Sequence, residues 1–147
     1  HDVVSDCIAS LEPLANAKRV ELLGRVDAPA TVHGSVAELS RALTNVVANA
    51  IRHSPGAGRV EVHLGRTGTG SAELSVRDEC GGIWDDVLTR VFDVGYRGAS
   101  ERGTAPQDGG AGLGLAITRG IIEAHSGTVR VENTDNGCRF RLQLPAA

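Results

Sequence analysis

The sequence predicts a two-layer α+β sandwich in which three main helices pack on one face of a mixed β-sheet. Three observations predict it. Apolar residues recur at helical spacing in three long segments, apolar and polar residues alternate in pairs of short segments, and one long stretch has neither pattern. The chain has 147 residues, the length of one domain with a single core. We therefore expect residues 1–147 to form one domain.

The N-terminal part of the chain is predicted to contain one helix and a pair of short strands. Apolar residues recur every three or four positions over residues 2–18, which predicts an amphipathic helix. The residues of 20–26 and 30–33 are typical of short strands, with an Asp-Ala-Pro sequence between them. We expect these two segments to pair.

A second helix is predicted over residues 35–53. Ser35 is a good N-cap, and Glu38 three residues later completes a capping box. A Ser-Pro-Gly sequence ends the helix. Residues 59–67 and 72–78 then alternate apolar and polar side chains around a Gly-rich turn, which predicts a β-hairpin.

The C-terminal half is predicted to contain a long loop, a third helix and two strands. Residues 84–92 have a short helical periodicity, whereas 93–110 have no period and are rich in Gly, Ser, Thr, Pro and charged residues. A loop of this length in a compact domain is usually functional, often as a lid. Apolar periodicity predicts a helix over 111–124, followed by strands over 128–132 and 138–144.

Composition and charge exclude several classes of protein. The formal net charge is −3, which argues against broad binding to nucleic acids or anionic membranes. No segment approaches the ~18 apolar residues of a transmembrane span. Cys7, Cys80 and Cys138 lack C-x-x-C spacing, which fits a reducing cytosol and predicts neither a disulfide framework nor a zinc site.

The most informative segment is residues 108–117, where glycines run directly into an apolar helical pattern. Glycine lets backbone N–H groups approach an anion, and a helix N-terminus adds further unpaired N–H groups. The spacing does not match G-x-G-x-x-G, and the only lysine, Lys18, lies far from this segment, which excludes a G-x-x-x-x-G-K-[ST] loop. Interleaved Leu and Ile residues argue against a flexible linker, so the segment predicts a polyphosphate-binding loop.

The polar face of the second predicted helix carries two asparagines one turn apart. It comprises Glu38, Arg41, Asn45, Asn49 and Arg52. Asparagine is a poor residue for a helix interior, because its amide competes with the backbone. We interpret Asn45 and Asn49 as candidate ligands of Mg²⁺, shared with phosphate oxygens. A merely solvated face is the alternative.

Asp78 ends a predicted strand and is followed closely by Gly81 and Gly82. A buried carboxylate accepts hydrogen bonds only. It would therefore accept one from the exocyclic amine of adenine and disfavour guanine by roughly 1.5–3 kcal/mol. The alternative is an ordinary turn at the end of a strand.

These segments together resemble, in chain order, the N, G1, F and G2 boxes of the ATP-binding catalytic domain of two-component sensor histidine kinases. The boxes correspond to residues 45–54, 78–83, Phe92 and 109–114. The resemblance covers nearly the whole chain. It implies the Bergerat-type α/β sandwich shared with DNA gyrase, Hsp90 and MutL, with ATP bound between the helices and a long lid.

The resemblance also implies a role for each matching residue. Asn49 would bind Mg²⁺, Asn45 would belong to the same metal and phosphate network, and Asp78 would recognise adenine. Arg52 would complete the catalytic set by reaching phosphate. The other nucleotide contacts would be His53, Gly82, Ile83, Gly110, Gly112, Leu113 and Gly114, with Phe92 bracing the lid. Independently of the resemblance, Arg97 and Arg102 in the predicted loop are candidate phosphate contacts, and solvated charges are the alternative.

Two cysteines depart from the family pattern. Cys80 stands where the family usually has the first glycine of Asp-x-Gly-x-Gly, and Cys138 stands where it commonly has threonine. Cys80 would be strained if its position required a positive φ, unless Gly81 takes that conformation instead.

The reaction is predicted to be transfer rather than hydrolysis. Gyrase-like ATPases have a glutamate four residues before the metal-binding asparagine, and Asn45 occupies that place here. An amide is no general base at neutral pH. The resemblance implies that the acceptor is a histidine of the dimerisation domain of the parent kinase, since no histidine here has the acceptor's setting. An anti-sigma-type serine kinase and a non-catalytic ATP-binding module are the alternatives.

The resemblance further implies a cytoplasmic domain of a membrane-bound sensor kinase that acts indirectly on a response regulator. We expect the isolated domain to be monomeric and to bind no nucleic acid. The chain does not begin with methionine, and we expect it to be a fragment of the longer kinase.

Overall fold

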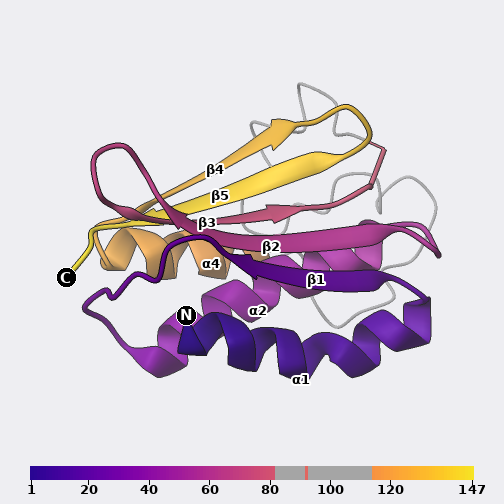
Figure 1. Ribbon diagram of the computed structural model, residues 1–147, viewed down its shortest axis with the longest axis horizontal. Helices are drawn as coiled ribbons and strands as arrows, with labels where there is room; N and C mark the ends of the chain where they lie inside the picture. The colour runs from indigo at the N-terminus through magenta and orange to yellow at the C-terminus, as the bar shows by residue number, and fades with distance from the viewer. Residues whose placement is uncertain (82–91, 93–113) are drawn as a thin grey trace.

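The computed structural model describes residues 1–81, 92 and 114–147 (Figure 1). The predicted helix over 84–92, apart from Phe92, and the predicted loop over 93–110 lie outside these residues. So does the beginning of the third predicted helix.

Three described helices cover one face of a five-stranded mixed sheet (Figure 1), which confirms the predicted fold class. The helices are α1 (Asp2–Lys18), α2 (Val36–His53) and α4 (Gly114–Ala124). The strands are β1 (Glu21–Val26), β2 (Arg59–Arg66), β3 (Ala72–Arg77), β4 (Thr128–Asn133) and β5 (Cys138–Leu144). None of the described helices has the length and apolar composition needed to cross a lipid bilayer.

The strand order is β1-β2-β3-β5-β4. β1 and β2 are parallel, with α2 between them in the chain, whereas β2–β3, β3–β5 and β5–β4 are antiparallel. The β3–β5 pairing places Arg77 opposite Arg139. It therefore joins the N-terminal part of the chain to the C-terminal hairpin and brings the end of β3 beside the beginning of β5.

The predicted strand over residues 30–33 is wrong. Residues 31–33 are not in a strand, and Thr31 and His33 are exposed. The Thr31 carbonyl instead accepts a hydrogen bond from Ala147 N–H at 2.7 Å. β1 lies at the edge of the sheet and its neighbour is β2, to which it is parallel, so the predicted pair does not form. Four residues are too short a pattern to distinguish a strand from an extended connection.

The capping box predicted for α2 is half confirmed. Ser35 is the N-cap, and its hydroxyl accepts from Glu38 N–H at 3.2 Å. The Ser35 N–H, however, donates to His125 Nε2 at 3.2 Å, and the Glu38 carboxylate lies 3.9 Å from the same nitrogen. His125 Nδ1 also contacts the Ile121 carbonyl at 2.8 Å. The imidazole therefore connects the beginning of α2 to the end of α4.

The core lies between α2 and the sheet. The apolar face of α2 is buried at Leu43, Val46, Val47, Ala50 and Ile51, while Val36 in its first turn is 68% exposed. Phe140 of β5 is buried and meets Phe92 edge to face, with ring centroids 5.9 Å apart. Aliphatic packing therefore holds α2, and with it the two asparagines, in a fixed position over the sheet.

Candidate functional site

Asp78 lies directly after β3 and continues its pairing with β5. Its N–H donates to the Cys138 carbonyl at 3.0 Å. The side chain is 1% exposed, and Oδ1 accepts from the N–H groups of Cys80 at 3.1 Å and Cys138 at 3.2 Å. No Lys, Arg or His of the described residues forms an ion pair with this carboxylate. The structure therefore holds a buried carboxylate in place with neutral donors only.

Two thiols lie beside this carboxylate. Cys138 Sγ is 3.3 Å from both Asp78 oxygens, and Cys80 Sγ is 3.5 Å from Cys138 Sγ. The hydrogen bond with Cys80, the burial of the side chain and the charge of Asp78 all raise the pKa of the Cys138 thiol. Both cysteines that depart from the family pattern therefore contact Asp78, the predicted adenine-binding residue. Cys138 does so through its thiol and Cys80 through its backbone N–H, and the two thiols contact each other.

Glycines allow the two backbone segments to approach this closely. A Cβ at Gly137 would collide with the Asp78 carbonyl group. Gly81 has φ +86°, and its N–H donates to the Asn136 carbonyl at 3.1 Å. Cys80 is absent from the described residues with positive φ. Gly81 therefore takes the conformation that would have strained Cys80.

Ser54 connects the end of α2 to the same turn. Its side chain is buried, and its hydroxyl accepts from Glu79 N–H at 3.4 Å. The sequence pattern predicts only that Ser54 ends the helix, although a small hydroxyl residue at a helix end is a signal for a side-chain contact of this kind. Because of this bond, the C-terminal part of α2 lies beside the Asp78 turn.

The two asparagines of α2 have different surroundings, although both are half-buried. Asn45 Nδ2 donates to the Gly114 carbonyl at 3.2 Å, which connects α2 to the beginning of α4. Asn49, one turn further along, has no hydrogen-bond partner among the described residues. Arg52 and His53 follow and are exposed. The structure therefore places Asn45 beside Gly114 and leaves the Asn49 amide open to a ligand.

A buried threonine supports the same contact between helices. Thr118 is fully buried, and its hydroxyl lies 3.0 Å from the Ala42 carbonyl and 3.1 Å from the Gly114 carbonyl. Thr118 was missed from the sequence. Its place on the apolar face of a predicted helix is the signal that could have identified a buried, hydrogen-bonded hydroxyl.

The remaining predicted nucleotide contacts lie outside the described residues. These are Gly82, Ile83, Arg97, Arg102, Gly110, Gly112 and Leu113. Within the described part of the chain, the candidate site consists of Asp78 and its turn, the polar face of α2 and the beginning of α4.

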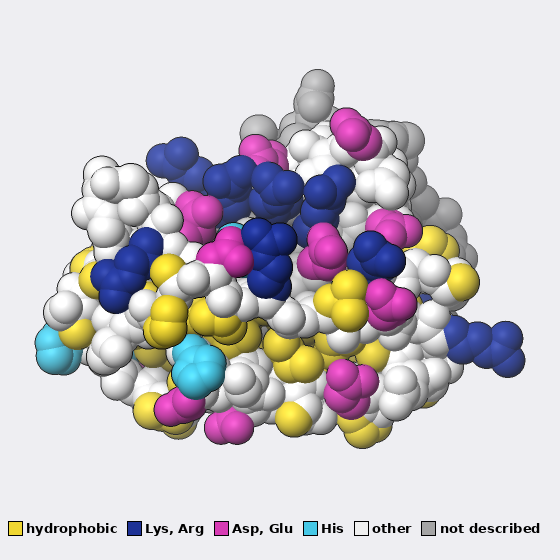
Figure 2. Space-filling model, in the orientation of Figure 1, with side chains coloured by type: hydrophobic (Ala, Val, Ile, Leu, Met, Phe, Trp, Pro, Cys, Tyr) yellow, Lys and Arg dark blue, Asp and Glu magenta, His cyan; other side chains and the backbone are white. Residues whose placement is uncertain are grey.

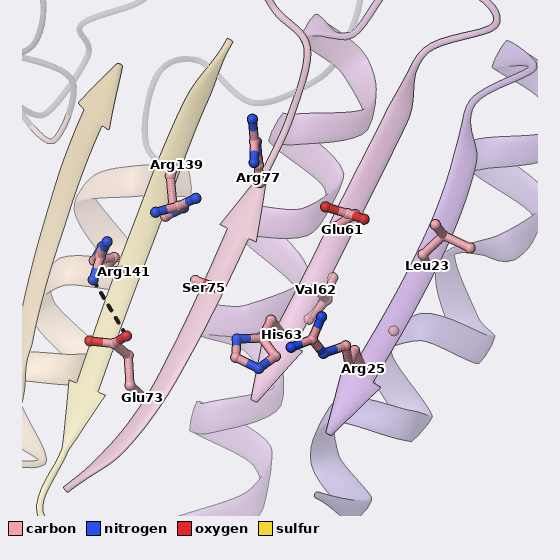
Figure 3. Close-up of a pocket in the computed structure, with 11 residues that line it drawn as sticks. Leu23, Arg25, Glu61, Val62, His63, Glu73, Ser75, Arg77, Arg139 and Arg141 are labelled. Atoms are coloured by element: carbon pink, nitrogen blue, oxygen red, sulfur yellow. Dashed lines mark ion pairs between the residues drawn. The ribbon is translucent and has the colours of Figure 1, made fainter. Parts of the chain in front are cut away.

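The outer face of the sheet carries a different feature, a shallow depression of about 560 Å³ (Figure 3). Figure 2 shows basic side chains gathered over the sheet. Several are paired with acids: Arg141 lies 2.7 Å from Glu132 and 3.5 Å from Glu73, and Arg139 lies 3.6 Å from Glu132. The depression faces away from the helices, and its ion pairs are typical of a solvated surface.

Comparisons with known proteins agree with this architecture. A family model of histidine kinase-, DNA gyrase B- and HSP90-like ATPases matches residues 34–147. The sensor-like histidine kinase SenX3 of Mycobacterium tuberculosis (strain ATCC 25618 / H37Rv) is 37% identical over 147 residues, which cover 98% of this chain and 35% of SenX3. The chain thus spans about a third of the length of this curated relative.

Two solved structures are similar over nearly the whole chain. The mycobacterial sensor histidine kinase MprB has a TM-score of 0.83 and 34% identity, covering 97% of this chain and 95% of that one. Full-length ShkA in complex with AMPPNP has a TM-score of 0.84 and 26% identity, covering 99% of this chain and 30% of that one.

Proposed function

Since the chain belongs to the histidine kinase-, DNA gyrase B- and HSP90-like ATPase family, we propose that it is the ATP-binding catalytic domain of a two-component sensor histidine kinase. In this proposal residues 1–147 bind Mg-ATP and transfer its γ-phosphoryl group to a histidine of a separate dimerisation domain. The likeness to the sensor kinases SenX3 and MprB supports this choice within the family. The phosphorylated histidine then supplies a response regulator, and the domain acts in the cytoplasm, where ATP is available.

The observation that carries the proposal is the buried carboxylate of Asp78. Oδ1 already accepts two backbone N–H groups, whereas Oδ2 accepts, within the described part of the chain, only from the Cys138 thiol. Oδ2 is thus the acceptor for the exocyclic amine of adenine. Guanine presents a carbonyl oxygen there, and the resulting repulsion should cost about 1.5–3 kcal/mol. The complex of ShkA with AMPPNP, an ATP analogue, supports an adenine nucleotide as the ligand.

The α2 asparagines fit a magnesium ion held together with phosphate. Asn49 offers an amide oxygen without a hydrogen-bond partner among the described residues, and Asn45 uses its NH₂ group on Gly114, which leaves its oxygen as an acceptor. Neutral amide oxygens suit Mg²⁺, which keeps few protein ligands besides phosphate and water. When bound, the ion neutralises charge on the transferring phosphate.

The residues of this chain bind and orient the nucleotide, and the partner supplies the nucleophile. Asn45 cannot remove a proton from water, so hydrolysis is slow. In the transfer, a histidine nitrogen forms a bond to the γ-phosphorus while the bond to the β,γ-bridging oxygen breaks and ADP leaves. Arg52 is exposed near the end of α2, where its guanidinium can contact the phosphates. Such transfer depends on in-line positioning.

A phosphotransfer assay with separate domains tests the proposal. We expect radiolabelled ATP and Mg²⁺ to label the histidine-containing dimerisation domain of the parent kinase when it is mixed with this chain. Neither domain should be labelled alone, and the label should be acid-labile. Acid-labile label on the 147-residue chain alone would contradict the proposal. Acid-stable label on a serine-containing partner would favour the serine-kinase alternative.

A further inference from the structure

Asp78, Cys80 and Cys138 form a compact cluster of potential metal ligands. One ligand atom from each residue lies within 4.8 Å of the other two. The carboxylate and the Cys138 side chain are almost fully buried, while Cys80 is half-buried at the edge of the cluster. The cluster is therefore both preformed and accessible from one side.

The distances within the cluster match a metal site better than a disulfide. Two thiolates at about 2.3 Å from a tetrahedral zinc ion are about 3.8 Å apart, and a thiolate and a carboxylate oxygen are about 3.5 Å apart. The corresponding distances are 3.5 Å between the sulfurs and 3.3 Å between Cys138 Sγ and Asp78. A disulfide bond of about 2.05 Å would require the sulfurs to move much closer together.

The backbone fixes the three ligands before any ion binds. Gly137 packs directly on the Asp78 carbonyl, and the Gly81 N–H is bonded to Asn136. Asp78 Oδ1 is held by two backbone N–H groups, whereas Oδ2 accepts from the Cys138 thiol, whose proton leaves when a cation binds both groups. Little rearrangement is needed, which favours binding.

We propose that Asp78, Cys80 and Cys138 bind a soft divalent cation of the zinc class, with a solvent molecule as the fourth ligand. Both thiols lose their protons to solvent when the ion binds, so one Zn²⁺ enters and two H⁺ leave. The two thiolates and the carboxylate more than balance the charge of the ion. Three protein ligands with an open fourth position are a known arrangement for zinc.

Occupancy of this site has a consequence for nucleotide binding, and this part of the inference rests on the proposed function. The cation would occupy Asp78 Oδ2, the oxygen assigned to the adenine amine. Metal and ATP should therefore exclude each other. The metal affinity itself does not depend on the proposed function.

Cobalt binding without nucleotide tests the site directly. We expect one equivalent of Co²⁺ to produce a thiolate-to-cobalt charge-transfer absorption band in the reduced 147-residue chain, and Zn²⁺ to abolish it by displacement. Cys80→Ser and Cys138→Thr should each weaken binding by roughly a hundredfold. Cys7→Ser, the third cysteine, should bind as the parent does. Cys80→Ser keeps the test valid if Cys138→Thr is unstable, because Cys80 lies at the edge of the cluster.

Two results would overturn the metal site. One is the absence of a thiolate–cobalt band in the reduced parent. The other is unchanged cobalt affinity in Cys80→Ser.

Competition is measured with ATP and GTP in excess Mg²⁺. Both nucleotides chelate cobalt through the same triphosphate, so GTP corrects for removal of cobalt by chelation. We expect ATP to abolish the band at a roughly tenfold lower concentration than GTP. Equal effects of the two would overturn the shared site. Failure of the metal-free chain to bind ATP would instead contradict the proposed function, and the cobalt band would still decide the metal site.

Discussion

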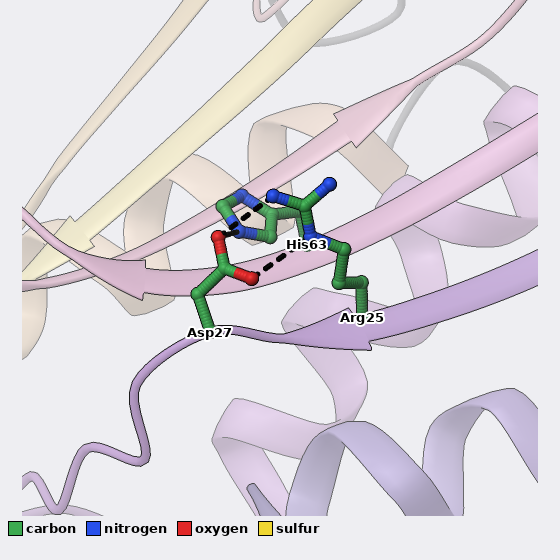
Figure 4. A network of polar contacts seen from close by, with 3 residues as sticks. All are labelled: Arg25, Asp27 and His63. Carbon is green, nitrogen blue, oxygen red and sulfur yellow. Dashed lines mark hydrogen bonds and ion pairs between the residues drawn. The ribbon is translucent and has the colours of Figure 1, made fainter.

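Two aspartates at strand ends have opposite surroundings. Asp27 follows β1 and is exposed, and its carboxylate accepts from Arg25 Nε at 2.8 Å and Nη2 at 2.9 Å and contacts His63 Nε2 at 2.7 Å (Figure 4). Asp78 follows β3 and is buried, and its donors among the described residues are N–H groups and a thiol. The Asp27 carboxylate is thus compensated by a guanidinium and by solvent, whereas no described cation and little solvent reach that of Asp78.

The difference indicates which of the two can bind a ligand. An exposed ion pair contributes little, because solvent screens both charges. A buried carboxylate without a cation is costly to the folded state unless donors surround it. Within the described residues, Asp78 Oδ2 accepts only from the Cys138 thiol, a weak donor. In the proposed function, the adenine amine completes its set of donors.

Replacing Asp78 should have the largest effect. In Asp78→Asn, the amide oxygen can still accept the two backbone N–H groups, but the NH₂ group then faces the adenine amine. We expect the Kd for ATP to rise about ten- to a hundredfold, because a hydrogen bond to an ionised group contributes about 1.5–3 kcal/mol. Isothermal titration calorimetry measures the change, and thermal unfolding reports whether the variant is folded.

Asp27→Asn is the matched control for this comparison. It makes the same chemical change at the other strand end, and the Kd for ATP should stay at the parent value. If both variants raise the Kd for ATP equally, or if neither raises it, the different surroundings of the two aspartates do not explain ATP binding.

The two asparagines of α2 differ in the same way, because Asn45 has a hydrogen-bond partner and Asn49 has none among the described residues. We expect Asn49→Ala to remove most of the Mg²⁺ dependence of ATP binding, because it deletes the open amide oxygen. Calorimetric titrations with and without Mg²⁺ would give the dependence in parent and variant. An unchanged Mg²⁺ dependence would mean that Asn49 is not a ligand.

Asn45→Ala should act on stability more than Asn49→Ala does. Both changes give α2 the same gain in helix propensity, so the difference between the variants isolates the hydrogen bond from Asn45 to Gly114. We expect Asn45→Ala to have a free energy of unfolding about 1 kcal/mol lower than Asn49→Ala. Urea denaturation measures it, and equal stabilities would show that this bond contributes nothing net.

The smallest effect is expected at Asp27 and depends on pH. The hydrogen bonds from Arg25 and then His63 lower the Asp27 pKa below its ordinary value of 3.8. A lowered pKa in the folded state stabilises it above the pKa of the unfolded chain, and this contribution is lost as the pH falls through the folded-state pKa. The advantage in stability of the parent over Asp27→Asn should therefore be lost on acidification, shrinking below about pH 4 as the Asp27 carboxylate becomes protonated.

Urea denaturation at a series of pH values checks this prediction. Added salt should reduce the advantage at every pH, because the pair is exposed. An advantage that grows on acidification would contradict the assignment of the lowered pKa to Asp27.

Local patterns predicted the three described helices and the two hairpins, because each depends on neighbouring residues. The apolar periodicity of α2 and the alternation in β2 and β3 are examples. The strand predicted over 30–33 failed, because four residues carry too little pattern. The parallel pairing of β1 with β2 has no local signal either, since the partners are separated by a whole helix.

The contacts of the candidate site were only partly predictable. The sequence placed Asp78 at a strand end and both asparagines on one helix face, and the structure agrees. It could not place Cys80 against Cys138, because their contact depends on the pairing of β3 with β5. Sequence motifs for metal sites depend on ligands that lie a few residues apart in the chain. Cys80 and Cys138 are too far apart in the sequence to match such a motif.

The described residues form two halves, each continuous in the chain, that meet where β3 pairs with β5. One half contains α1, β1, α2, β2 and β3, and the other contains α4, β4 and β5. The contacts of Asp78 with Cys138 and of Asn45 with Gly114 cross the boundary between these halves. A ligand bound across this boundary stabilises the association of the two halves. At a concentration a hundred times its Kd, the stabilisation is about 2.7 kcal/mol. A chain cut between the halves should therefore reassemble more readily when the ligand is present.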